Sequence, residues 1–156
     1  MKKLFKIFCM TAVLTLFTAC GSAKESDTIS GELPDLMDQI YDEVKPDMPE
    51  RGTIEITDEN LSYYTGAETL DYKEALACEP LMGSYPHSVV LVRLNPDADP
   101  EDAKNAIREN VDPRKWICVE VEKDNIIVDN IGDLVILIMD NDQPEEFQKA
   151  FHKLAK

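Results

Sequence analysis

The sequence lacks the short motifs that mark common catalytic sites. It has no GxSxG turn to present a nucleophilic serine, no HExxH zinc motif, and neither the GxGxxG nor the GxxxxGK[ST] loop that binds phosphates. Histidine occurs only as His87 and His152. We therefore expect no catalytic residues, no cofactor and no metal site, and we favour a binding protein over an enzyme.

Basic residues are scarce. The 156 residues include 16 Lys and Arg against 31 Asp and Glu, which gives a formal net charge of −15. Nucleic-acid binding requires clustered basic side chains that neutralise phosphates, and attraction to anionic lipid headgroups requires the same. The composition therefore excludes nucleic acid as an expected partner, and it leaves the protein surface little affinity of its own for a membrane.

Long apolar runs are absent except at the N-terminus. Three lysines within the first six residues precede an uncharged run over residues 7–17. That run is about half of the roughly 20 residues that a membrane-spanning helix needs, and the order of basic, apolar and small residues is typical of a secretory signal. We therefore expect an exported chain without a permanent membrane span.

The small residues at the end of this run lead directly into a cysteine, in the order FTACG. This stretch resembles the bacterial lipobox, in which the cysteine receives diacylglycerol and becomes the mature N-terminus. The resemblance implies cleavage between Ala19 and Cys20 and an anchor of lipid, with acyl chains such as palmitate, on Cys20. Two acyl chains give stable anchoring, whereas a single chain is marginal.

These features predict three parts of the chain: a lipoprotein signal peptide at 1–19, a lipidated N-terminus and flexible tether at 20–31, and a single α+β domain at 32–156. Loss of residues 1–19 would remove three basic and no acidic residues and would leave a formal charge of −18. The mature length suits one domain. We expect it at the outer face of a cell membrane, held there by the lipid on Cys20.

Three amphipathic helices are indicated by apolar spacing. They are expected over residues 33–44, from Asp99-Pro100 through Ile107, and from Asp142 through Leu154. A shorter helical segment is expected after Thr57, ending at Gly66. Acidic residues precede the second and third helices, where they cap free backbone N–H groups and complement the helix dipole.

Strands are indicated over residues 88–94, which are apolar on both faces and should therefore be covered on both sides, and less clearly over 72–79. Residues 117–122 alternate between apolar and polar, and with 126–128 and 134–139 they predict a three-stranded meander. The predicted fold class is α+β: a two-layer single domain in which amphipathic helices pack on an antiparallel sheet.

A second resemblance covers residues 33–154. The segments LSYYTG, EALACEPLMGSYPHSVVLVRL and IIVDNIGDLVILIMDN, followed by a helix containing phenylalanine, resemble a family of Firmicutes lipoproteins catalogued as a domain of unknown function. The resemblance implies a Gram-positive source and membership of that class of lipoprotein. It implies no activity and no site residues.

Several residues are candidates for a site. Ser84 and His87 fit a catalytic pair less well than a polar turn leading into a strand, and His152 is expected on the surface of the last helix. The acidic clusters at 97–102 and 140–142 suggest calcium, but the first departs from the EF-hand pattern, and helix capping is the preferred interpretation. Tyrosines can form a recognition surface or pack in the core, and both interpretations remain open for Tyr63, Tyr64, Tyr72 and Tyr85.

Only Cys78 and Cys118 remain as thiols in the predicted domain. Export would permit a disulfide between them, but the alternation at 117–122 places Cys118 on the polar face, so both states stay open. The expected function is a lipid-anchored extracytoplasmic module that binds or scaffolds an unidentified envelope protein or ligand. A cell-envelope hydrolase and a small-ligand binder are the alternatives.

Overall fold

The structure is a computed structural model that describes residues 28–155. Its elements are, in chain order, α1 (Leu33–Val44), β1 (Arg51–Glu55), α2 (Leu61–Thr65), β2 (Tyr72–Pro80), β3 (His87–Leu94), α3 (Pro100–Asn110), a short 3-10 turn (Lys123–Asn125), β4 (Ile126–Ile131), β5 (Leu134–Asp140) and α4 (Pro144–Lys153). The five strands form one antiparallel sheet in the order β1-β2-β3-β5-β4. The predicted α+β single domain is confirmed.

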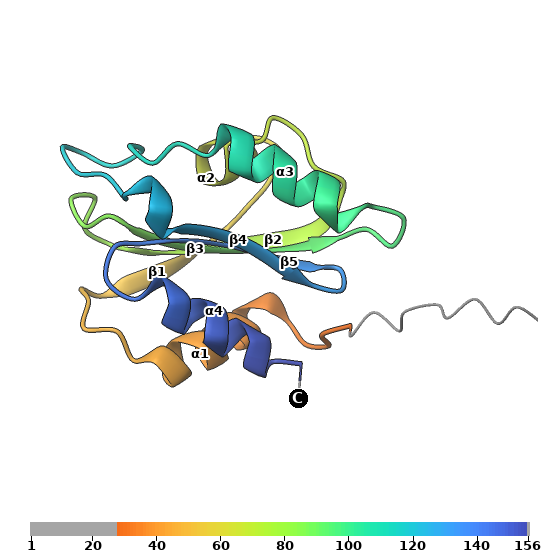
Figure 1. Ribbon diagram of the computed structural model, residues 1–156, viewed down its shortest axis with the longest axis horizontal. Helices are drawn as coiled ribbons and strands as arrows, with labels where there is room; N and C mark the ends of the chain where they lie inside the picture. Colours follow the sequence, from red (N-terminus) through yellow and green to blue (C-terminus); the bar gives the residue numbers. More distant parts are fainter. Residues whose placement is uncertain (1–27, 156) are drawn as a thin grey trace, which may run out of the picture.

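The sheet is covered by helices on both faces (Figure 1). Helices α1 and α4 lie side by side below it, and α2 and α3 lie above it. Each face has its own apolar core, one around Phe147 and Phe151 of α4 and the other around Ile107 of α3 and Trp116. The domain therefore has three layers, and the predicted two-layer arrangement is wrong. The central strands β3 and β5 are buried along their whole length, as the continuous apolar sequence of 88–94 predicted.

The helices begin where the sequence indicates. Proline occupies the first turn of α1, α3 and α4, where its missing N–H costs no hydrogen bond. The Asp99 carboxylate accepts a hydrogen bond from the Glu101 backbone N–H at 2.9 Å, so it caps α3 as expected. Helix α4 has no side-chain cap, but Asp140 Oδ1 accepts hydrogen bonds from the N–H groups of Asp142 and Gln143 and so holds the turn that leads into it.

The predicted three-stranded meander is reduced to the hairpin of β4 and β5. Residues 117–122 form no strand, and Cys118 has a left-handed φ of 64° that is incompatible with one. The segment follows the end of the sheet as a loop, which is closed by a hydrogen bond from Val121 N–H to Pro113 C=O. The alternation of apolar and polar residues in this segment arises because Val121 is buried while its neighbours face solvent. Ile117, which was expected in the core, is 72% exposed.

The chain enters the domain at one end of the sheet. The Arg93 guanidinium, near the end of β3, donates hydrogen bonds to the C=O groups of Ile29 and Gly31 at 2.7 and 2.8 Å. The β2–β3 turn precedes His87 at the beginning of β3, which is about 20 Å away at the rise of an antiparallel strand. Figure 1 shows the turn and the entering chain at opposite ends of the sheet.

Within residues 28–155, no helix is long and apolar enough to cross a membrane. The predicted signal peptide, the cleavage position at Ala19 and Cys20, and most of the predicted tether lie outside the described residues.

Candidate functional site at the turn end of the sheet

A histidine is completely buried at the beginning of β3, on the face covered by α1 and α4. His87 Nδ1 lies 2.6 Å from Asp140 Oδ2, and its Nε2 lies 2.6 Å from the Tyr41 hydroxyl. Because β3 and β5 are paired in register at His87 and Asp140, the sheet itself holds the ring against the carboxylate. In the neutral ring, Nδ1–H donates to Asp140 and Nε2 accepts from Tyr41, so both nitrogens are satisfied.

The network continues from Tyr41 toward the surface. The Arg51 guanidinium lies over the Tyr41 ring, 4.1 Å from its centroid, and donates a hydrogen bond to Cys78 Sγ at 3.4 Å. Its other nitrogen forms an ion pair with the exposed Asp38 at 3.0 Å. Burial, followed by the neighbouring Cys78, raises the pKa of Tyr41 well above its ordinary value, so the hydroxyl remains protonated.

Asp140 remains ionised although its side chain is almost completely covered. Burial opposes ionisation, but the hydrogen bond from His87 and the two backbone N–H groups of the turn before α4 together lower the pKa of this carboxyl. Asp140 thus fixes both the histidine and the turn that leads into α4. The arrangement is a structural clamp between α1, β3, β5 and α4.

These contacts exclude the Ser84 and His87 catalytic pair. Both ring nitrogens of His87 are engaged elsewhere, and the ring has no exposed surface. Ser84 lies in an exposed turn, as the preferred sequence interpretation had it. Cys78 is fully buried, so it is not placed to attack a substrate either. The surface position predicted for His152 is confirmed, and its ring is paired with Asp129 at 2.8 Å.

A second buried polar group lies on the opposite face of the same end of the sheet. Lys115 extends its ammonium group inward, where Nζ lies 2.6 Å from Glu79 Oε1 and 3.1 Å from Ser88 Oγ. Its side chain is only 3% exposed. Burial lowers the pKa of Lys115, and the Glu79 carboxylate opposes that shift. Ser88 is fully buried, so this pair of serine and lysine is not accessible to a substrate.

Aromatic rings surround the same ammonium group. Nζ of Lys115 lies 5.0 to 5.4 Å from the centroids of Tyr63, Tyr64 and Trp116, within the range of cation–π attraction. The two tyrosines of α2 contact each other edge to face, with centroids 4.9 Å apart. The sequence indicated Tyr63 and Tyr64 as candidates for a recognition surface, but it did not indicate Lys115. No spacing rule links α2 to the loop that carries this lysine about fifty residues later.

The large exposed apolar side chains lie in segments that adjoin His87 and Lys115. Leu81 and Met82, in the β2–β3 turn, are 69% and 55% exposed, and Tyr63 is 50% exposed. Ile117 lies beside the turn, because its N–H donates to the Gly83 C=O at 3.2 Å. We call four of these residues the apolar end: Tyr63, Leu81, Met82 and Ile117. They are the large apolar residues that stand exposed in the described part of the chain.

The charges around the apolar end are mainly acidic. Exposed acids lie in the adjoining loops together with the exposed bases Lys45 and Arg114, of which Arg114 is paired with Glu120 at 2.5 Å. Lys115 is buried, so it adds no charge to the surface. The acids are Asp47, Glu50, Asp112 and Asp142.

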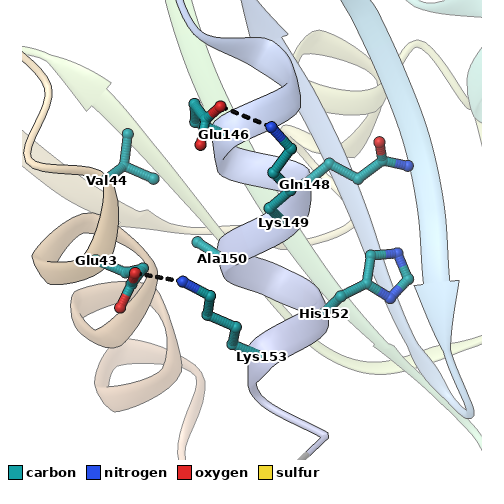
Figure 2. Close-up of a pocket in the computed structure, with 8 residues that line it drawn as sticks. All are labelled: Glu43, Val44, Glu146, Gln148, Lys149, Ala150, His152 and Lys153. Atoms are coloured by element: carbon teal, nitrogen blue, oxygen red, sulfur yellow. Dashed lines mark hydrogen bonds and ion pairs between the residues drawn. The ribbon is translucent and has the colours of Figure 1, made fainter.

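Hollows lie elsewhere on the molecule, and two of them concern the candidate residues. One, of about 420 Å³, runs between α1 and α4 (Figure 2), and its charged side chains pair with each other as Glu43 with Lys153 and Glu146 with Lys149. The other, of about 710 Å³, lies beside the first turn of α1 and the beginning of β2.

Acidic residues line the larger hollow, but their carboxylates are largely committed to the fold. Asp58 accepts from Tyr72, Asp71 accepts from Asn95, and Glu74 pairs with Arg93. Tyr72 therefore lies at this hollow, away from Tyr63 and Tyr64. Across residues 28–155, no three His, Cys, Asp or Glu side chains converge as a metal site would need.

The two cysteines of the domain are separate free thiols. Cys78 lies in the core between the sheet and α1, and Cys118 is exposed on the loop at 111–122. The disulfide that the sequence left open is therefore not formed. Comparisons of the chain with protein-family models, curated proteins and solved structures find no match. The resemblance to a Firmicutes lipoprotein family remains a prediction.

Proposed function

We propose that this chain is a lipid-anchored module at the outer face of a cell membrane, where it binds another envelope component by contact. The anchor rests on the basic, apolar and small residues that precede Cys20. The observation that supports contact is the gathering of four exposed apolar side chains at one end of the sheet. Exposed apolar patches rimmed by polar residues are typical of interaction sites.

The position of the apolar end suits an anchored protein. The chain enters the domain beside Arg93, at the opposite end of the sheet. A lipid on Cys20 would therefore leave Met82 and Ile117 free to meet a neighbour. Anchoring also raises the effective concentration of neighbouring membrane components, so that modest affinity suffices.

The chemistry of the apolar end defines the partner that it fits. Its centre is apolar and its rim carries exposed acids, so a complementary surface has an apolar recess bordered by Lys or Arg. The buried clamps around His87 and Lys115 hold the turn and the neighbouring loop in place. A surface that is fixed before binding loses less entropy when it binds.

Site-specific photo-cross-linking in cells tests this proposal. A photoreactive residue at Ile117 or Met82 should trap one envelope protein, because both positions lie on the proposed contact. The matched control is Asp97, which is exposed in the β3–α3 connection at the other end of the sheet. Equal adducts at Ile117 and Asp97, or none at Ile117 and Met82, would contradict the proposal.

A further inference from the structure

The two edges of the sheet differ. At the β4 edge, the Arg108 guanidinium of α3 donates a hydrogen bond to the Val128 C=O at 2.7 Å, so a side chain occupies an outward carbonyl in the middle of this strand. At the other edge, no strand among residues 28–155 pairs with the outer side of β1. An open edge offers unpaired backbone groups to a further strand.

The direction of the β1 backbone groups follows from the hydrogen bonds that bracket the strand. Leu81 N–H donates to the Glu50 C=O at 2.8 Å, and Ile56 N–H donates to the Ala75 C=O at 2.9 Å. In an antiparallel pair, successive residues alternate between facing the neighbouring strand and facing away from it. The even-numbered residues of β1 therefore bond to β2.

The odd-numbered residues, Arg51, Thr53 and Glu55, point their N–H and C=O groups outward. The Glu55 C=O accepts a hydrogen bond from Asn60 Nδ2 at 3.1 Å, which confirms that it points outward and also engages it at the end of the strand. Thr53 is exposed and lies in the middle of the five-residue strand. Its N–H and C=O form the centre of the open edge.

This edge is complementary to itself. If two copies of β1 run antiparallel about a two-fold axis at Thr53, Arg51 of each copy lies opposite Glu55 of the other. Both side chains project on the α1 face, because Arg51 lies opposite Pro80 and Glu55 lies opposite Leu76. Pro80 and Leu76 are each two residues from Cys78, so they share its face of the sheet, and Cys78 belongs to the core under α1. Opposite charges thus meet twice across the axis.

Apolar groups meet on the other face in the same arrangement. Gly52 of one copy lies opposite Ile54 of the other, and the space above Gly52 is taken by Leu81, whose Cδ2 would lie 3.0 Å from a Cβ at this position. Leu81 is 69% exposed in the single chain. Pairing would place it beside Ile54 of the second copy and so remove apolar surface from water.

We propose that the β1 edge binds a second copy of this chain, in antiparallel register centred on Thr53, to form a continuous ten-stranded sheet. The contact is held by reciprocal backbone hydrogen bonds of Thr53, by the two charge pairs of Arg51 with Glu55, and by the two contacts of Leu81 with Ile54. This contact takes up Leu81 of the apolar end and does not use Tyr63, Met82 or Ile117, which remain for the partner proposed above.

Disulfide trapping in cells that produce the full-length chain tests the register. With Cys118→Ser as background, Thr53→Cys places two thiols on the axis, within the roughly 4.4 to 6.8 Å between Cα atoms that a disulfide spans. Mild oxidation should give a dimer on a non-reducing gel. Thr57→Cys, also exposed but four residues from the axis, is the control and should give at least tenfold less dimer.

A second pair of variants separates this contact from chance collision. Thr53→Pro removes the outward N–H without touching a hydrogen bond to β2, and it should abolish co-purification of two differently tagged full-length chains. Thr53→Val keeps the N–H and should co-purify as the wild type does. Equal dimer from Thr53→Cys and Thr57→Cys, or co-purification unchanged in Thr53→Pro, would overturn the proposal.

Discussion

Several buried polar side chains of this domain find a partner from a distant element. His87 is held by Tyr41, 46 residues earlier, and by Asp140, 53 residues later. A buried polar group without a hydrogen bond costs about 1–3 kcal/mol. Such pairs cannot be recognised in one sequence, because no fixed spacing joins α1, β3 and β5. The polar turn before His87 was predicted correctly, but the burial of the histidine was not.

Replacing Tyr41 with Phe tests the clamp at the scale of a single atom. The ring packing against Phe147 is kept, but His87 Nε2 loses its hydrogen-bond partner. We expect the free energy of unfolding to fall by about 1–3 kcal/mol in a urea titration. The control is Tyr85→Phe, whose hydroxyl makes a 3.4 Å contact with the exposed Asp142 and should cost under about 0.5 kcal/mol. Equal effects of the two substitutions would show that the hydroxyl of Tyr41 contributes nothing specific.

At the scale of the elements, the helices and strands with the clearest sequence pattern were the ones predicted correctly. Helices α1, α3 and α4 and strands β3 and β5 were predicted because apolar spacing, proline and acidic caps agree. Strand β1 was missed, since RGTIE has one apolar residue and lies at an edge. Residues 117–122 were mistaken for a strand, because a loop that buries one residue gives the same alternation as a half-buried strand.

The start of α3 provides a quantitative test of the capping argument. Asp99→Ala removes the carboxylate that accepts from Glu101 N–H, and it should lower the free energy of unfolding by about 1 kcal/mol in chemical denaturation. Asp97→Ala changes an exposed acid two residues earlier and should change stability by less than about 0.5 kcal/mol. A loss from Asp97→Ala as large as that from Asp99→Ala would point to general charge effects and not to the cap.

At the scale of the whole molecule, the error in the number of layers has a simple origin. The continuous apolar sequence of β3 already required cover on both faces, yet too few helices were assigned to the second face. That cover includes α2 and the loop at 111–122, and both are short or irregular in sequence. The apolar end could not be predicted, because its four exposed residues come from three separate segments.

The central claim is that this module is held at a membrane by lipid on Cys20, with its apolar end directed to a neighbour. Mass spectrometry of the N-terminal peptide from the membrane fraction tests it most directly. We predict a peptide that begins at Cys20 and carries diacylglycerol on its sulfur, and we predict that Cys20→Ala abolishes this modification and releases the protein or leaves it unprocessed. A membrane-bound chain that retains residues 1–19 and an unmodified Cys20 thiol would contradict the account.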